Sequence, residues 1–380
     1  MWQGICKQPG KRLLTRTLVL LFAATMLFGA VQAQNPGIPN ALAVDEDGTV
    51  HVPAQSVPPS QFLSPEGKAY LAEHLKKVRQ PQLLQQDKDN GVPPLIAGYL
   101  DRQRTLFTVD KQDTTVGGVH AFVYTPRNGV STRNRQRVLI DLHGGGFSGC
   151  WPGCAELESI PIAALGRIRV VSLDYREAPK YRFPAASEDV AAAYAELLKT
   201  YHAADIGIYG CSAGGMLTGE VVAWFQQHGL PAPGAVGIFC AGMTVPDRGF
   251  GGDADYTATP IGEARMVAMP PMADSKTRRA AASPLGYFEG ADLHSPLVSP
   301  AVSPQVLAKF PPSLIITGTR GFELSSAVYT HTQLVKNGAV AELHVWEGLF
   351  HGFFYNPDVP ESRDCYDVIV RFFDRSLGKH

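Results

Sequence analysis

The chain has 380 residues, of which 45% are hydrophobic and 18% charged, and its formal net charge is −1. This composition indicates a globular protein with a large core and argues against a disordered chain. The 34 basic and 35 acidic residues are balanced and form no basic run beyond the N-terminus, so we expect a small-molecule partner and no nucleic acid.

Residues 1–33 have the pattern of an export signal. Four basic side chains precede an apolar run at 17–30, and Val-Gln-Ala at 31–33 offers the small residues that a signal peptidase recognises. We expect cleavage before Gln34 and export to the periplasm or the medium, with no stable membrane insertion of the mature chain. An uncleaved anchor is the alternative, although the apolar run is short for a bilayer core about 30 Å thick.

Export would bring the five cysteines beyond residue 34 into an oxidising compartment, where thiols tend to pair. Cys150 and Cys154 flank a Pro-Gly turn and are close enough in sequence for a local disulfide, but the sequence leaves the pairing open. Metal binding there is disfavoured, because no histidine or second cysteine pair stands nearby at ligand spacing. We expect no metal and no organic cofactor.

The mature chain begins with a segment rich in Pro and Gln, residues 34–104, which we interpret as an N-terminal arm with a helix at 65–78. Residues 105–380 then form one domain. It opens with an expected antiparallel pair of strands at 105–109 and 119–124.

Beyond residue 138, short apolar runs alternate with longer helical patterns, as in a mainly parallel sheet covered on both faces. The predicted strands are 138–142, 169–173, 206–209, 235–239, 313–317 and 341–346. The predicted helices include 187–199, 213–228, 325–337 and 362–377. Residues 243–312 break this rhythm, and we interpret them as an insertion that forms a cap together with the N-terminal arm.

Two glycine-rich motifs follow predicted strands. Gly-Cys-Ser-Ala-Gly-Gly at 210–215 stands between a strand and a helix, which fits the tight turn that raises a serine hydroxyl above a parallel sheet. His-Gly-Gly-Gly-Phe at 143–147 leaves backbone N–H groups open to a ligand. Either motif alone has a purely structural explanation, whereas the two together indicate a hydrolase site.

These motifs, with Asp174-Tyr175-Arg176 and Phe350-His351-Gly352-Phe353, resemble the hormone-sensitive-lipase-like branch of the α/β-hydrolase superfamily, the bacterial HGGG carboxylesterases. The resemblance runs from about residue 137 to residue 380. It implies an α/β-hydrolase fold, a mainly parallel sheet flanked by helices. It also implies a serine carboxylesterase that hydrolyses short to medium acyl esters through an acyl-enzyme. The Asp-Tyr-Arg motif is expected only to brace the serine turn and the cap through buried ionic and turn contacts.

The resemblance implies a role for each matching residue. Ser212 would be the nucleophile, and His351 would be the base that takes and returns its proton. The N–H groups of Gly145, Gly146 and Ala213 would form the oxyanion hole.

The acid is where the sequence departs from the family. Related chains carry an aspartate at about the position of Gly321, and glycine has no side chain to orient a histidine. Glu323 is the nearest carboxylate and is the predicted acid, with Glu347 and a dyad without an acid as alternatives. Cys211 replaces the aspartate more usual before the serine; a thiol nucleophile there is formally possible, but the turn presents Ser212 instead.

Three functions are consistent with these residues. A carboxylesterase is the first, and a hydrolase-fold protein that has lost catalysis and only binds ligands is the alternative that Gly321 keeps open. An amidase or thioesterase would use the same groups. Apolar residues of the insertion either line a substrate pocket or pack the cap's own core. These residues are Phe250, Tyr256, Met266, Met269 and Met272. We find no sequence basis for an oligomeric state.

Overall fold

The computed structural model describes residues 43–378 except 86, 88–90, 245–251 and 264–285. The chain divides into two units, Met1–Ser56 and Val57–His380. The described part of the first unit holds two short antiparallel strands, β1 (Ala43–Val44) and β2 (Val50–His51). The expected export signal lies outside the described residues, and none of the described helices is long and apolar enough to cross a membrane.

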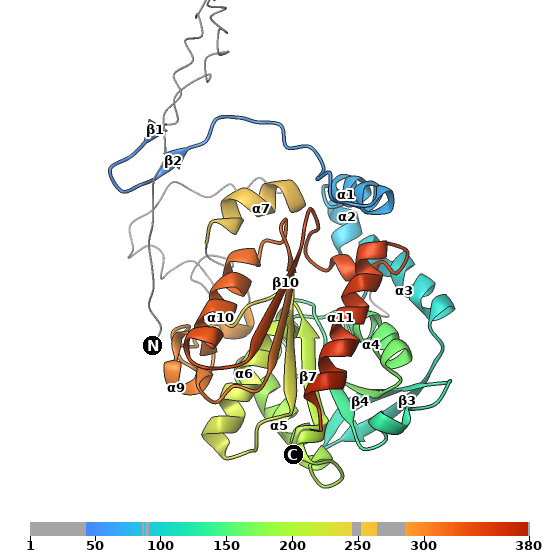
Figure 1. Cartoon of the computed structure of the whole chain (residues 1–380). Coiled ribbons are helices and arrows are strands. Elements are labelled where there is room, and N and C mark those ends of the chain that lie inside the picture. Colours follow the sequence, from blue (N-terminus) through green and yellow to red (C-terminus); the bar gives the residue numbers. More distant parts are fainter. Residues whose placement is uncertain (1–42, 86, 88–90, 245–251, 264–285, 379–380) are drawn as a thin grey trace, which may run out of the picture. The chain divides into compact units, whose positions relative to one another are not determined.

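A single eight-stranded sheet forms the centre of the second unit (Figure 1). Its strands are β3 (Val109–Val116), β4 (Val119–Pro126), β5 (Val138–Leu142), β6 (Arg169–Leu173), β7 (Ile206–Cys211), β8 (Ala235–Phe239), β9 (Ser313–Gly318) and β10 (Ala341–Trp346). Their order is β10-β9-β8-β7-β5-β6-β4-β3. Strands β5 to β10 are all parallel, while β4 is antiparallel to both β3 and β6. The predicted fold class is therefore confirmed.

Helices cover both faces of this sheet. The α-helices are α1 (Pro65–Lys77), α2 (Pro81–Leu84), α3 (Pro94–Leu106), α4 (Gly153–Gly166), α5 (Ala185–Leu197), α6 (Ala213–His228), α7 (Ala254–Gly262), α9 (Pro304–Leu307), α10 (Leu324–Lys336) and α11 (Pro360–Ser376). One core joins the sheet to α5, α6 and α10, and a second joins it to α1, α3, α4 and α11. Alternate residues of one strand belong to different cores: Ile140 faces the first and Leu139 the second. Both faces are covered, which is why these strands read as continuous apolar runs.

One predicted strand begins too early, and helix α4 is not among those predicted. Residues 105–106 are the end of α3, and the edge strand β3 begins only at Val109. This strand is mostly polar and largely exposed, so its hydrophobic signal is weak. None of the helices named from the sequence covers 153–166, where α4 forms; α4 is buried on almost every side, so it lacks the polar face that reveals a helical period.

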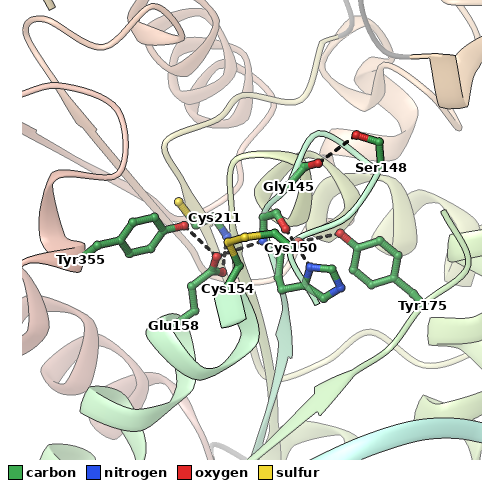
Figure 2. The surroundings of a disulfide bond; sticks show 10 residues. Gly145, Ser148, Cys150, Cys154, Glu158, Tyr175, Cys211 and Tyr355 are labelled. Atoms are coloured by element: carbon green, nitrogen blue, oxygen red, sulfur yellow. Dashed lines mark hydrogen bonds between the residues drawn. A yellow bond between two sulfur atoms is a disulfide. The ribbon is translucent and has the colours of Figure 1, made fainter. Parts of the chain in front are cut away.

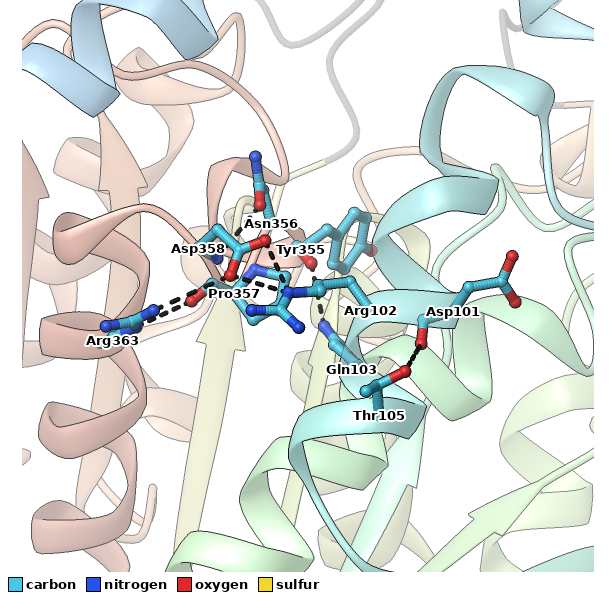
Figure 3. Close-up of polar contacts among 9 residues, drawn as sticks. All are labelled: Asp101, Arg102, Gln103, Thr105, Tyr355, Asn356, Pro357, Asp358 and Arg363. Carbon is cyan, nitrogen blue, oxygen red and sulfur yellow. Dashed lines mark hydrogen bonds and ion pairs between the residues drawn. The ribbon is translucent and has the colours of Figure 1, made fainter.

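The N-terminal arm is bonded to the chain that follows β10. In α3, Arg102 pairs with Asp358 at 2.8 Å, and the Gln103 side-chain amide donates to the carbonyl of Tyr355 at 2.9 Å (Figure 3). Nearer the start of the arm, Ser64 donates through both its N–H and its hydroxyl to Glu361 at the start of α11. These contacts make the arm, from residue 57 onward, part of the larger unit.

The described part of the predicted cap meets the arm beside the loop after β9. Arg320 in that loop donates to the carbonyl oxygens of Ile261 at 3.0 Å and Pro58 at 2.8 Å. A covering role for these segments stays a prediction. Of the five residues predicted for the cap, Tyr256 lies exposed on α7, and the other four fall outside the described residues.

Candidate active site

Ser212 occupies a sharp turn between β7 and α6. Its backbone angles are φ 57° and ψ −120°, which a residue other than glycine rarely adopts, and its N–H donates to the carbonyl of Phe239 at 2.8 Å. A Cβ at Gly214 would lie 1.5 Å from the carbonyl oxygen of Leu142, so only glycine lets the start of α6 approach β5 this closely. Ser212 therefore has the backbone geometry predicted from its motif.

The glycine-rich loop after β5 lies against this turn, because β5 and β7 are neighbours in the sheet. A Cβ at Gly144 would lie 3.1 Å from the carbonyl oxygen of Cys211. Among the described residues, the N–H groups of Gly145 and Gly146 have no hydrogen-bond acceptor. Ala213 is the first residue of α6, where N–H groups lack an acceptor within the helix. All three N–H groups are thus available to an anion.

A disulfide closes the end of this loop (Figure 2). Cys150 and Cys154 are bonded, with a Cα–Cα distance of 5.3 Å, and the bridge ties the loop to the first turn of α4. The structure therefore contains the Cys150–Cys154 disulfide, which the sequence left open. On the other side, the Tyr175 hydroxyl donates to the carbonyl of His143, and Arg176 pairs with Asp189. Tyr175 of the Asp-Tyr-Arg motif thus braces the glycine-rich loop, while the expected bracing of the serine turn and the cap stays a prediction.

A buried carboxylate on α4 connects three parts of the site. Glu158 accepts the N–H of Gly144 at 2.9 Å, the N–H of Cys211 at 3.0 Å and the hydroxyl of Tyr355 at 2.8 Å (Figure 2). Burial raises the pKa of Glu158 well above its usual range, and the nearby Asp141 carboxylate adds to this effect. Sequence reasoning missed Glu158; the available signal was a charged residue within the apolar run of α4, where a carboxylate must find donors.

His351 follows β10 and is bonded to the predicted acid. Its Nδ1 lies 3.0 Å from Oε2 of Glu323, which is fully buried. The Thr317 hydroxyl donates to the other carboxylate oxygen at 2.7 Å, and Phe322 stacks on the ring with centroids 4.3 Å apart. Burial lowers the pKa of His351, but the charge and hydrogen bond of Glu323 outweigh it and raise the pKa to about 9.

The missing side chain at position 321 leaves room for this carboxylate. A Cβ at Gly321 would lie 2.5 Å from Oε1 of Glu323 and 2.8 Å from its Cδ. Glu347, the other candidate acid, is exposed beyond the end of β10, and the described residues show no hydrogen bond between it and His351. Glu323 therefore fills the space that a side chain at 321 would need.

Ser212 and His351 lie at the same edge of the sheet, since both follow parallel strands at their carboxyl ends. Both residues are described, and no hydrogen bond joins their side chains in this structure; such bonds are often long before a substrate binds. Burial raises the pKa of the Cys211 thiol well above its usual range, which argues against a thiolate nucleophile there. The Cys240 sulfur lies within 4.8 Å of donor atoms on both Glu323 and His351.

Two known proteins are similar to this chain in sequence. An acetyl-hydrolase from Streptomyces hygroscopicus is 28% identical over 249 residues, covering 65% of this chain and 78% of the relative. A carboxylesterase/phospholipase, LipF, from Mycobacterium tuberculosis is also 28% identical, over 62% of this chain and 61% of its own length.

Solved structures of esterases are similar to this chain in fold. An esterase superimposes with a TM-score of 0.70 at 28% identity, covering 86% of this chain and 98% of its own. An esterase of the bacterial hormone-sensitive lipase family gives a TM-score of 0.66 at 25% identity over 83% and 99%. The sequence profile described as alpha/beta hydrolase fold matches residues 139–355. The chain therefore belongs to the alpha/beta hydrolase fold family, is a carboxylic ester hydrolase, and is similar to an esterase of the bacterial hormone-sensitive lipase family.

Proposed function

We propose that the protein is an exported serine carboxylesterase with Ser212 as nucleophile, His351 as base and Glu323 as acid. The observation that carries this proposal is the partly buried hydrogen bond between His351 Nδ1 and Glu323. This hydrogen bond gives the His351 ring a carboxylate partner in a chain that lacks the family aspartate near position 321. The Ser212 turn and the open N–H groups of the glycine-rich loop provide the rest of the machinery.

The chemistry follows from which ring nitrogen carries the proton. Glu323 accepts the Nδ1 proton, so the lone pair on Nε2 of His351 is free to take the proton of Ser212 as its oxygen attacks the ester carbonyl. The N–H groups of Gly145, Gly146 and Ala213 would stabilise the oxyanion, and such donors are worth about 3 kcal/mol each. The protonated ring then passes its proton to the leaving alcohol, and water repeats the sequence on the acyl-enzyme.

The substrates we propose are esters with short to medium acyl groups. The relatives include an acetyl-hydrolase, which supports a small acyl group. An amidase or thioesterase would use the same residues, because the pocket and not the triad recognises the leaving group.

Loss of catalysis is the second candidate function, and the position of Glu323 weakens it. The argument for an impaired enzyme was the glycine at 321. Since the Glu323 carboxylate fills the space beside Gly321 and bonds His351, that glycine is compatible with a complete triad.

The first experiment is hydrolysis of p-nitrophenyl acetate and butyrate by the purified protein, with an anilide and a thioester of the same acyl groups in parallel. We expect ester turnover that disappears in Ser212→Ala. Glu323→Gln should lower kcat by roughly 10³-fold or more, as for triad acids elsewhere. Glu347→Gln is the matched control and should leave kcat unchanged. Turnover that survives in Ser212→Ala would rule out the serine mechanism.

Export is part of the same proposal and rests on residues 1–33 alone. Sequencing the N-terminus of the protein recovered from the periplasm or medium should find Gln34 first. Protein that stays inside the cell with residue 1 intact would overturn it.

A further inference from the structure

Three side-chain atoms that could bind a metal ion lie close together, and one of them belongs to the proposed base. The sulfur of Cys240, a carboxylate oxygen of Glu323 and a ring nitrogen of His351 lie within 4.8 Å of one another. Cys240 and Glu323 are fully buried, while the His351 side chain is 19% exposed and gives the cluster its access to solvent. The reaction proposed above uses Glu323 and His351 but has no role for Cys240.

The backbone around Cys240 holds its sulfur in this place. Cys240 directly follows β8 and has a φ of 47°, in the left-handed region that residues with a Cβ seldom occupy. Its N–H donates to the carbonyl of Ile316 in β9 at 2.7 Å. Its sulfur accepts the N–H of Gly352, the residue after His351, at 3.2 Å. Cys240 is thus fixed to both strand β9 and the loop that carries the base.

We propose that Cys240, Glu323 and His351 form an inhibitory site for Zn²⁺ and other thiophilic divalent cations such as Cd²⁺. Sulfur, nitrogen and oxygen donors in one compact group are the ligand set that Zn²⁺ prefers, with bonds of about 2.0–2.3 Å. Small side-chain rotations would draw the donors to that distance. A thiolate and a carboxylate also balance the two charges of the cation, which a buried site requires.

Binding would release one proton from the Cys240 thiol and, from the charged ring, one proton from Nδ1 of His351. The metal then holds Nδ1, the atom that faces Glu323. The remaining ring proton is on Nε2, so the ring has no lone pair left to accept the Ser212 proton. The ester site itself is not filled. The expected inhibition is therefore noncompetitive, with a lower kcat and an unchanged KM.

Only the effect on turnover rests on the proposed function, so metal binding is measured first without catalysis. The Ser212→Ala protein is titrated with CdCl₂ and followed by the ultraviolet charge-transfer band of a cadmium–thiolate bond. We expect one cation per chain. Cys240→Ser in the same background should abolish the band, and competition with a coloured chelator should give an affinity at least about tenfold lower. Cys365→Ser is the matched control, since Cys365 is also a fully buried free cysteine, in α11, and should bind as before.

The absence of a band in Ser212→Ala, or an equal band after Cys240→Ser, would overturn the site. If Cys240→Ser does not fold, Glu323→Gln serves instead and should also bind Cd²⁺ at least about tenfold more weakly. In the wild-type enzyme, ZnCl₂ should lower kcat, EDTA should restore it, and MgCl₂ should have no effect. Cadmium binding without inhibition of an active enzyme would contradict the inhibitory role, whereas an inactive wild-type protein would count against the proposed function alone.

Discussion

The carboxylate of Glu323 lies where a side chain at position 321 would lie, 2.5 Å from the place of a Cβ there. The sequence predicts Ser212 and His351 from their motifs and Glu323 as the nearest carboxylate, and the structure shows the hydrogen bond between His351 and Glu323. The sequence could not reveal that Thr317 holds the second carboxylate oxygen, because that contact depends on the path of the loop. In the triad that we propose, the acid is therefore relocated by two residues from the position of the family aspartate.

This relocation can be reversed by mutation. Glu323→Ala should lower kcat by roughly 10³-fold or more, since the ring loses its partner. Gly321→Asp alone should lower Tm, because two carboxylates would compete for one buried space. The double variant Gly321→Asp/Glu323→Ala restores the family arrangement and should recover part of the lost kcat. A double variant no more active than Glu323→Ala would mean that residue 321 cannot reach the base.

The raised pKa of His351 sets the pH dependence. The base must be neutral to accept a proton, so kcat/KM should rise with pH up to an apparent pKa of about 9. Glu323→Gln removes the charge that favours the protonated ring and should move this midpoint down. The same interaction stabilises the fold fully below the unfolded pKa of His351, near 6.5, and this contribution is lost as pH rises through about 9. A midpoint that does not fall in Glu323→Gln would contradict the assignment of the acid.

Among the helices and strands, helix α4 has a structural role that could not be predicted from its sequence. Parallel strands were predictable because short apolar runs stand out against helical patterns, whereas α4 is apolar on nearly every side and interrupted by acidic residues. Its Glu158 accepts hydrogen bonds from the glycine-rich loop, from Cys211 beside Ser212 and from Tyr355, and the disulfide fixes its first turn to the same loop. The helix thus links segments far apart in the chain, which local patterns cannot reveal.

We therefore expect Glu158 to hold the glycine-rich loop and the turn at Ser212 in place. Glu158→Gln keeps the volume but leaves one oxygen for three donors, so at least one buried N–H loses its acceptor, at a cost of about 1–3 kcal/mol. We expect a lower Tm and a kcat reduced more than KM is changed. Glu156→Gln is the matched control, because Glu156 lies on the same helix and pairs with Arg104 and Lys111 away from these loops. Equal losses of kcat in both variants would argue against a positioning role.

In the whole molecule, the boundary between the two structural units lies near residue 57, inside the arm predicted as 34–104. The composition of the arm predicts where the arm lies in the sequence but not the division near residue 57. That division depends on contacts between the arm and distant parts of the chain, such as those made by Ser64 and Arg320. Residues from Val57 onward pack with the catalytic domain, and α1 adds the buried side chains of Tyr70 and Leu71 to its second core.

Truncation tests this division. A chain that starts at Val57 should have the Tm of one that starts at Gln34. A chain that starts at Arg79 loses α1, and each large apolar side chain removed from the core costs about 1.5–3 kcal/mol, so its Tm should fall by several degrees or more. A large loss of Tm in the Val57 chain would instead make the first unit part of the stable fold. Circular dichroism melting curves are sufficient for the comparison.

Covalent labelling of the nucleophile tests the central claim most directly. The protein is treated with diethyl p-nitrophenyl phosphate, which phosphorylates activated serines, and then analysed by intact mass and peptide mapping. Ser212 supported by His351 and Glu323 should carry one diethylphosphoryl group, Glu323→Gln should react more slowly, and Ser212→Ala should not react. An unlabelled wild-type protein, or a group attached with equal yield in Ser212→Ala, would contradict this account.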